Sequence, residues 1–170
     1  DLIDGAKKVD YQFEGGISQF VEDLTGGRAR LHQEPIKVTK EIDGTIVEAA
    51  LQYNESFTEN VLSFANCINT VDGGTHLTGL RSALTRIMND YGRKHKVIKD
   101  NEANLAGEDT REGLAAVISV KLQDPQFEGQ TKGKLGNPEI RAQVESALSE
   151  EVSIWLGAVS YTHLRAHETR

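Results

Sequence analysis

The amino-acid sequence predicts an α+β fold, a small four-stranded sheet with helices packed on one face. The first half of the chain holds three runs in which apolar residues alternate, and a compact run rich in valine and isoleucine follows later. Around these runs, apolar residues recur at intervals of three and four, which is the spacing of a helix. The predicted order is helix, three strands, helix, strand, helix. Such an order favours a sheet with helices packed against it.

The first helix and the hairpin after it are predicted by local patterns. Residues 17–24 carry one apolar stripe, and two glycines follow it. Residues 36–42 and 47–53 alternate between apolar and polar side chains on either side of Asp43-Gly44. Aspartate followed by glycine favours the positive φ angles of a two-residue hairpin turn. These two strands are therefore expected to pair antiparallel.

A third strand is expected over residues 61–68. It contains the single cysteine, Cys67, which we expect to be a small buried strand residue rather than a reactive thiol. A long amphipathic helix then opens, capped by either Asp72 or Thr75. Its apolar stripe is formed by Leu77, Leu80, Leu84, Ile87, Met88 and Tyr91.

The second half of the chain is predicted to hold one strand and one helix. Residues 93–107 are polar and charged, so we expect a mobile loop. Residues 114–122 form a short apolar run typical of a buried strand. Asn137-Pro138 has the residue types of a helix cap and a first-turn proline. The apolar stripe of the helix that follows is Ile140, Val144, Leu148, Val152 and Trp155.

Composition restricts the function. A chain of 170 residues suits one domain, and its net charge of −7 argues against a surface that coats nucleic acid generally. No apolar run approaches the ~20 residues that a membrane helix needs. We therefore expect a cytoplasmic protein without a membrane partner. The first residue is Asp1 and the only methionine is Met88, so we expect a piece of a longer chain.

A glycine-rich basic loop is the first candidate for chemistry. It spans residues 127–136, between the buried strand and the last helix. Its glycines allow close approach to a ligand, Lys132 and Lys134 can offer ammonium groups to phosphate, and Gln130 can donate an amide hydrogen bond. The loop lacks the spacing of a Walker A motif. On these residues alone, a solvated basic loop is the alternative.

Two further segments contain candidate residues. Residues 72–76 could form an anion site at a helix N-terminus, with a capped tight turn as the alternative. His76 could act as a base, but a packing or capping role is the commoner outcome for such a histidine. Arg81 and Arg86 could face a polyanion, although a single helical arginine more often faces solvent.

A charged cluster precedes the buried strand, and it has two interpretations. Asp109, Arg111 and Glu112 could form an acid–base set. Acidic residues beside an arginine are more often an ion pair that fixes a loop. No metal-ligand spacing is present in the sequence.

Five motifs in order resemble one protein family. They are Glu14-Gly15-Gly16-Ile17, Ala50-Leu51-Gln52-Tyr53-Asn54, Asp72-Gly73-Gly74-Thr75-His76-Leu77-Thr78-Gly79, Arg111-Glu112-Gly113-Leu114 and Pro125-Gln126-Phe127-Glu128-Gly129-Gln130-Thr131-Lys132. Together they resemble the second domain, the transducer, of the B subunits of bacterial type II DNA topoisomerases. The likeness covers residues 11–155 and is closer to DNA gyrase than to topoisomerase IV.

The resemblance implies a fold and domain boundaries. It implies a four-stranded sheet with a left-handed β-α-β crossover, as in a ribosomal-protein superfamily, although right-handed crossovers are the rule. Residues 1–13 would end a preceding ATPase domain or linker, and residues 14–157 would form the transducer. Residues 158–170 are expected to be a non-native or disordered tail, because the apolar rhythm breaks there. A natural frayed end is the alternative.

The resemblance also implies a function. Lys132 would be the catalytic lysine that senses the terminal phosphate of ATP, with Gln130 as its partner. Arg81 would face the cavity through which double-stranded DNA passes. The ATP-binding residues and the Mg²⁺ ligands would lie mainly in the missing upstream domain, so the fragment alone is expected to be inactive. The expected partners are the A subunit of gyrase, that upstream domain and a second copy of the same chain, which dimerises on ATP binding.

Two other functions fit the same fold. A stand-alone RNA- or ribosome-binding module is opposed by the acidic balance and by the absence of interleaved aromatic and basic residues. A small-molecule kinase would need a phosphate loop rich in glycine and serine, and the sequence shows none.

Overall fold

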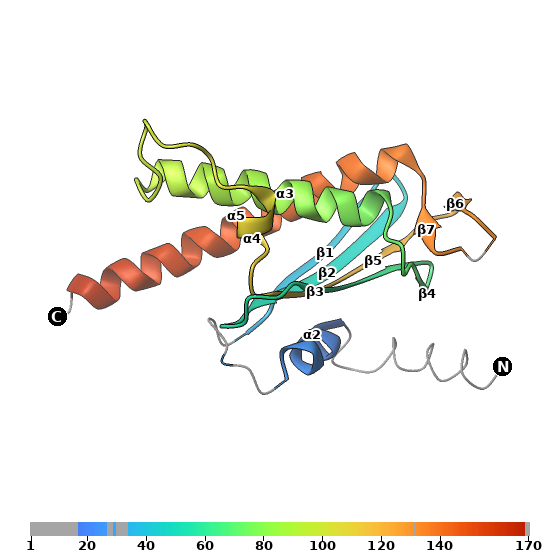
Figure 1. Cartoon of the computed structure of the whole chain (residues 1–170), viewed down its shortest axis with the longest axis horizontal. Coiled ribbons are helices and arrows are strands. Elements are labelled where there is room, and N and C mark those ends of the chain that lie inside the picture. Colours follow the sequence, from blue (N-terminus) through green and yellow to red (C-terminus); the bar gives the residue numbers. More distant parts are fainter. Residues whose placement is uncertain (1–16, 27–28, 30–33, 131, 169–170) are drawn as a thin grey trace.

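A single mixed sheet forms the centre of the protein. The computed structural model describes residues 17–26, 29, 34–130 and 132–168. In Figure 1 the sheet lies between helices. Its five strands follow the order β1-β2-β5-β3-β4. They are β1 (Ile36–Ile42), β2 (Thr45–Tyr53), β3 (Asn60–Ala65), β4 (Ile68–Asn69) and β5 (Leu114–Lys121). The α+β class is confirmed, and the expected count of four strands is corrected to five.

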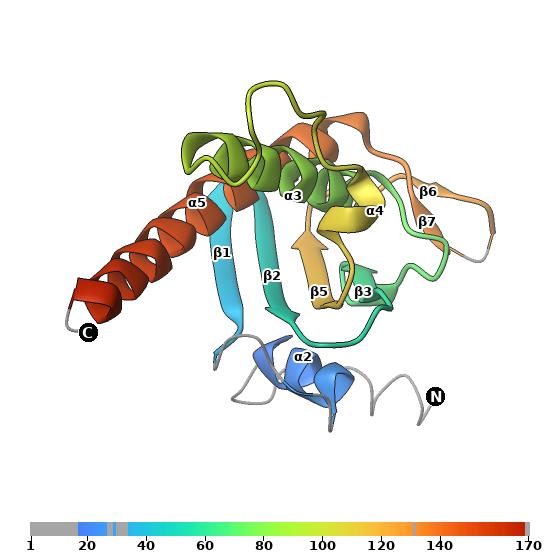
Figure 2. The same ribbon diagram turned by 60° about the vertical axis from the view of Figure 1, so that its left-hand side comes forward.

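Helices cover both faces of the sheet, whereas the sequence predicted one covered face. Helices α3 (Thr75–Lys94) and α5 (Pro138–Glu168) pack on one face, and α2 (Ile17–Thr25) packs on the other (Figures 1 and 2). The reason lies in β2 and β5, because residues 49–51 and 114–118 of these strands are apolar and buried on both faces. Leu51 belongs to the core under α3 and α5, while its neighbour Ala50 packs with Val21 of α2.

Two tight turns shape the strands. Asp43 and Gly44 have φ angles of 51° and 84°, and Ile42 pairs with Thr45, so the predicted hairpin turn is confirmed. The predicted third strand is instead broken by a second turn, at Asn66-Cys67, with φ angles of 49° and 68°. Cys67 is therefore a half-exposed turn residue, and its expected place as a buried strand residue is wrong.

The chain crosses over between two neighbouring parallel strands. β3 and β5 pair in parallel, with Asn60 opposite Ala115, and α3 lies between them in the sequence. This is β-α-β connectivity; its left-handed sense stays a prediction. A short helix, α4 (Gly107–Thr110), precedes β5 and was not predicted.

The long helices α3 and α5 pack closely together. Leu80, Leu84, Val144 and Leu148 between them are fully buried, which confirms these positions of the two apolar stripes. Met88 and Tyr91, the last residues of the predicted α3 stripe, are only partly buried. Gly79 lets the backbones approach, because a Cβ there would lie 2.7 Å from the Arg141 carbonyl oxygen. No described helix is both long and apolar enough to span a bilayer.

Helix α5 extends further than the predicted domain. It begins at Pro138, as predicted, and continues to Glu168, beyond the boundary expected at residue 157. That residues 158–170 are a non-native tail stays a prediction. The first 13 residues lie outside the described part of the chain.

The loop after α3, expected to be mobile, is tied back to that helix. Arg93 donates through Nε to the Asn104 side chain at 2.7 Å and through Nη2 to the Glu102 carbonyl at 2.8 Å. The Leu105 amide donates to Asn89 Oδ1 at 2.6 Å. Ile98 is buried against the end of the helix. The polar residues of this loop thus serve as anchors.

Candidate functional site

The glycine-rich basic loop forms a small hairpin that projects from the body of the protein. Its strands are β6 (Phe127–Glu128) and β7 (Lys134–Leu135), seen beyond the N-terminal end of α3 in Figures 1 and 2. Gln130 and Lys132 are exposed at its tip. Gly129 and Lys132 have φ angles of 84° and 57°. Left-handed backbone is common for glycine but uncommon for lysine, so the tip turns sharply at both residues.

The root of the hairpin is bonded to the turn that opens α3. The Asp72 amide donates to the Gly133 carbonyl at 2.8 Å, and the Leu135 amide donates to the Gly73 carbonyl at 3.1 Å. Gly74 forms a bridge to Leu135, and a Cβ on Gly74 would lie 2.5 Å from the Leu135 carbonyl oxygen. Only glycine allows this contact, which joins the basic loop to the residue that precedes α3.

Asn137 braces the same root from the other side. It is buried, and its Oδ1 accepts a hydrogen bond from the Gln126 amide at 2.6 Å. Its Nδ2 donates to the Asp124 carbonyl at 3.1 Å. We expected Asn137 to cap α5, but its side chain instead closes the loop that carries the hairpin.

The turn at residues 72–76 acts as a structural joint. The residue before α3 is Gly74, and no side chain caps the helix, so neither Asp72 nor Thr75 has the predicted capping role. His76 is fully buried, and its Nε2 lies 3.0 Å from the Thr70 hydroxyl. Burial lowers the pKa of His76 to about 4, so the ring is neutral at pH 7. His76 is therefore the packing residue, as the commoner interpretation predicted.

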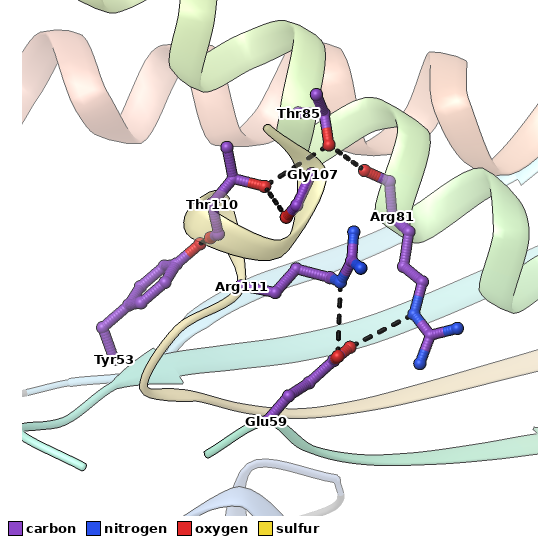
Figure 3. A network of polar contacts seen from close by, with 7 residues as sticks. All are labelled: Tyr53, Glu59, Arg81, Thr85, Gly107, Thr110 and Arg111. Atoms are coloured by element: carbon purple, nitrogen blue, oxygen red, sulfur yellow. Dashed lines mark hydrogen bonds and ion pairs between the residues drawn. The ribbon is translucent and has the colours of Figure 1, made fainter. Parts of the chain in front are cut away.

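A second polar region lies beside the middle of α3. Glu59 accepts a hydrogen bond from Arg111 Nε at 3.3 Å through Oε1 and from Arg81 Nε at 3.2 Å through Oε2. Figure 3 shows the two arginines on either side of this carboxylate. Arg111 therefore pairs with Glu59, and neither Asp109 nor Glu112 takes that position.

Tyr53 anchors the short helix beside these arginines. Its hydroxyl donates to the Thr110 carbonyl at 2.7 Å (Figure 3). Burial raises the pKa of Tyr53 well above its ordinary value, although the Arg111 charge opposes the rise. The Thr110 hydroxyl in turn donates to the Gly107 carbonyl at 2.7 Å. These bonds fix the segment that carries Arg111.

An open groove of about 480 Å³ lies next to this network. It is lined by Arg81, Ser82, Thr85, Arg86, Asn89, Asp90, Asn104 and Arg111. Arg86 donates to the Ser149 hydroxyl on α5. Of the described residues that line it, three are arginines and only Asp90 is acidic. The groove is therefore a local basic region on a chain whose net charge is −7.

The structure thus separates the predicted site residues into two regions. Gln130 and Lys132 lie at the hairpin tip, whereas Arg81 lies in the groove with Arg86. Sequence reasoning did not predict that Glu59 pairs with Arg81 and Arg111. The reason is that Glu59 is 22 positions from Arg81 and 52 positions from Arg111 in the sequence. Among the described residues, no cluster of three or more His, Cys, Asp or Glu side chains is arranged to hold a metal ion.

Comparison with known proteins identifies relatives of most of the chain. Residues 16–163 match the family described as DNA gyrase B. The chain is 52% identical to the DNA gyrase B subunit of Halalkalibacterium halodurans over 92% of its own length, and 54% identical to that of Clostridium acetobutylicum over 86%. It spans 24% and 23% of those relatives, about a quarter of their length.

Solved structures agree with this match. The 43K ATPase domain of Thermus thermophilus gyrase B is 36% identical, with a TM-score of 0.78. The similarity covers 90% of this chain and 43% of that one. The topoisomerase IV ATP-binding domain of Francisella tularensis is 29% identical, with a TM-score of 0.71, over 86% of this chain and 39% of that one.

Proposed function

The chain belongs to the DNA gyrase B family, and from this membership we propose that it is the transducer of an ATP-dependent type II DNA topoisomerase. In this role it couples ATP binding and hydrolysis to closure of a DNA clamp and to strand passage. The enzyme is an isomerase of the bacterial cytoplasm. Its partners are double-stranded DNA, the A subunit of gyrase and a second copy of the same chain, with which it dimerises on ATP binding.

The observation that carries the proposal is the position of Lys132. The lysine is exposed at the tip of a projecting hairpin, and the root of that hairpin is bonded to the start of α3. At the tip, its ammonium group is free to approach the terminal phosphate of ATP, and the Gln130 amide can donate beside it. A cation there stabilises the charge that develops on a transferring phosphoryl group.

The remaining parts of the ATP site belong to the preceding domain. The described residues offer donors for phosphate but no acidic cluster for Mg²⁺. We therefore assign the Mg²⁺ ligands and most ATP contacts to an ATPase domain that ends near residue 13, with the transducer over residues 14–157. Two similar structures support this assignment, because they are the ATPase domain of a gyrase B and the ATP-binding domain of a topoisomerase IV, and this chain covers only 43% and 39% of them.

The hairpin root supplies the coupling. The contacts of Gly73, Gly74 and Asp72 with β7 and its flanking residue connect the tip to α3 through backbone alone. When the phosphate leaves after hydrolysis, Lys132 and Gln130 lose their ligand and the hairpin is released. A ligand that biases an element between two positions is a known switching scheme.

We assign to Arg81 a contact with the phosphates of DNA. It lies on α3 with 43% of its side chain exposed, at the basic groove. A contact between an arginine and backbone phosphates is independent of sequence and falls with rising salt. Both properties suit a clamp that must hold and release any DNA segment.

The test is the Lys132→Ala substitution in the full-length protein that carries this chain. We expect nucleotide binding to stay within a fewfold of the unsubstituted protein, while ATP hydrolysis and supercoiling fall by about a hundredfold or more. Lys134→Ala is the matched control, because Lys134 is also exposed but lies in β7, away from the tip. Normal turnover in the Lys132 variant would refute the catalytic role.

A further assay is needed to distinguish gyrase from topoisomerase IV. The Myxococcus xanthus gyrase B and the Francisella topoisomerase IV domain have the same TM-score, 0.71, so the fold does not separate them. The identities of about half with gyrase B proteins favour gyrase. Reconstitution with the A subunit of gyrase should give ATP-dependent negative supercoiling; decatenation without supercoiling would favour topoisomerase IV.

A further inference from the structure

We propose that Glu59 is an internal counter-ion that competes with phosphate oxygens for Arg81 and Arg111. In this scheme the two arginines form one phosphate site, and Glu59 occupies it until a phosphate displaces the carboxylate. The inference rests on the proposed DNA role of Arg81 and adds to it a second arginine and the residue that regulates both.

The geometry places one carboxylate between two cations. Each carboxylate oxygen of Glu59 accepts from the Nε of a different arginine, at 3.2 and 3.3 Å. The three residues come from different segments, because Arg81 is on α3, Arg111 follows α4 and Glu59 precedes β3. Because these segments bring the guanidinium groups to the same carboxylate, a tetrahedral anion in that position could contact both.

The contacts of Glu59 are those of a replaceable ligand. Charge-assisted hydrogen bonds of this kind are typically about 2.7–2.9 Å long, and the strongest arginine–carboxylate pairs are bidentate. Here each pair is longer and uses one nitrogen of each arginine. Figure 3 draws each arginine bonded to Glu59 through Nε alone, with no contact to Glu59 from the terminal nitrogens of either guanidinium group. Those nitrogens remain available to a ligand that arrives from outside.

The surroundings favour an anion. The groove beside the pair is lined by Arg81, Arg86 and Arg111, together with hydroxyl and amide side chains that include Ser82 and Asn104. Among the described residues that line it, Asp90 alone is acidic. Three positive charges against one negative charge leave a surplus of two, and Glu59 reduces this surplus to one. Displacing Glu59 therefore exposes a groove that attracts phosphate more strongly.

The exposure of the three side chains fits the exchange. The Arg111 and Glu59 side chains are 17% and 24% exposed, and Arg81 is 43% exposed. Arg81 is thus the arginine that a phosphate meets first, and Arg111 is held behind it. Because an ion pair near solvent contributes little net stability, a multivalent anion can displace Glu59 at small cost.

The test compares Glu59→Gln with Glu48→Gln in the full-length protein. Each change removes one negative charge, and Glu48 is a suitable control because it pairs with Lys121 on the sheet and is 31% exposed. Binding of a short fluorescent DNA duplex is measured by anisotropy over a range of salt concentrations. We expect Glu59→Gln to tighten binding by about two- to fivefold, the equivalent of one exposed ion pair, and Glu48→Gln to leave it unchanged.

Two further variants locate the effect. Arg81→Ala should weaken duplex binding and reduce its salt dependence by about one phosphate contact. Arg111→Ala should have little effect while Glu59 is present, but in the Glu59→Gln background it should abolish the gain. Unchanged or weaker binding by a folded Glu59→Gln protein, with Arg81→Ala still harmful, overturns the counter-ion role alone. An Arg81→Ala protein that binds like the parent overturns the proposed DNA contact itself.

Competition between inorganic phosphate and the duplex distinguishes a site for single phosphates from a site that recognises the DNA backbone. If free phosphate competes with the duplex more strongly in the Glu59→Gln protein than in the parent, the site binds single phosphates. If only added duplex competes, the site recognises the DNA backbone.

Glu59→Asp tests the proposal if the Glu59→Gln protein does not fold. The substitution keeps the negative charge, but the side chain becomes too short to bridge both arginines. We therefore expect this variant also to bind DNA more tightly, and an affinity equal to that of the parent contradicts the proposal.

Discussion

The tip and the root of the β6–β7 hairpin are built in opposite ways. At the tip, Gln130 and Lys132 are exposed, and a Cβ added to Gly129 would meet nothing within 4 Å. At the root, the backbone of β7 is bonded to the turn before α3, and a Cβ on Gly74 would collide with it. The difference agrees with the proposed function, in which the tip adapts to a ligand and the root transmits the position of the tip to α3.

The largest effect on stability is expected at the root, from Gly74→Ala. Gly74 has φ 143° and ψ −167°, a region open essentially to glycine alone. The added Cβ would also lie 2.5–2.9 Å from Leu135 backbone atoms. We expect a loss of about 3 kcal/mol in the free energy of unfolding, measured by urea denaturation. A loss below about 1 kcal/mol would show that the root is loose.

Asn137→Ala should weaken the same root from its other side. The change removes the hydrogen-bond partner of the Gln126 amide and the Asp124 carbonyl, and it empties the buried position of Asn137. The expected loss in unfolding free energy is about 2–3 kcal/mol. Hydrogen exchange should show faster exchange of the Gln126 amide in the variant, and unchanged exchange would contradict the bracing role of Asn137.

His76 makes the root sensitive to acid. The unfolded chain takes up a proton near the ordinary pKa of 6.5, whereas in the folded protein burial lowers the pKa to about 4. Stability is therefore full above about pH 6.5 and is lost as the pH falls toward 4, by about 2 kcal/mol at pH ~5. Urea unfolding of the unsubstituted protein and of its His76→Gln variant, each above pH 6.5 and at pH ~5, measures this loss of stability. Equal acid sensitivity in the two proteins would exclude His76 as the cause.

The smallest effect is expected at the tip, from Gly129→Ala. Gly129 has a positive φ of 84°, so alanine is strained there, but it meets no neighbouring atom. We expect a loss of about 1 kcal/mol, well below that of Gly74→Ala. Comparable losses in the two glycine variants would remove the contrast between tip and root.

Local chemistry made part of this structure predictable. The turn at Asp43-Gly44 follows from two adjacent residue types, and the stripes of α3 and α5 follow from their periodicity. The turn at Asn66-Cys67 was missed because cysteine rarely adopts a positive φ. The place of α2 was missed because the apolar residues on both faces of β2 were not interpreted as a second packing surface.

The candidate site was less accessible to sequence reasoning. The exposed position of Lys132 agrees with a glycine-rich loop, but the bonds from its root to residues 72–74 join segments about sixty residues apart. The pairing of Glu59 with two arginines depends on three separate segments. Only the resemblance to known topoisomerases suggested a catalytic role for Lys132, and that role stays a prediction.

The most direct test of the account is hydrogen exchange at the root when a nucleotide binds at the tip. The full-length protein is compared with its Lys132→Ala variant, each saturated with a non-hydrolysable ATP analogue. We predict that the analogue slows exchange of the Asp72 and Leu135 amides in the parent and fails to do so in the variant, although both bind nucleotide. Equal protection in the two proteins would contradict the claim that Lys132 connects the phosphate to α3.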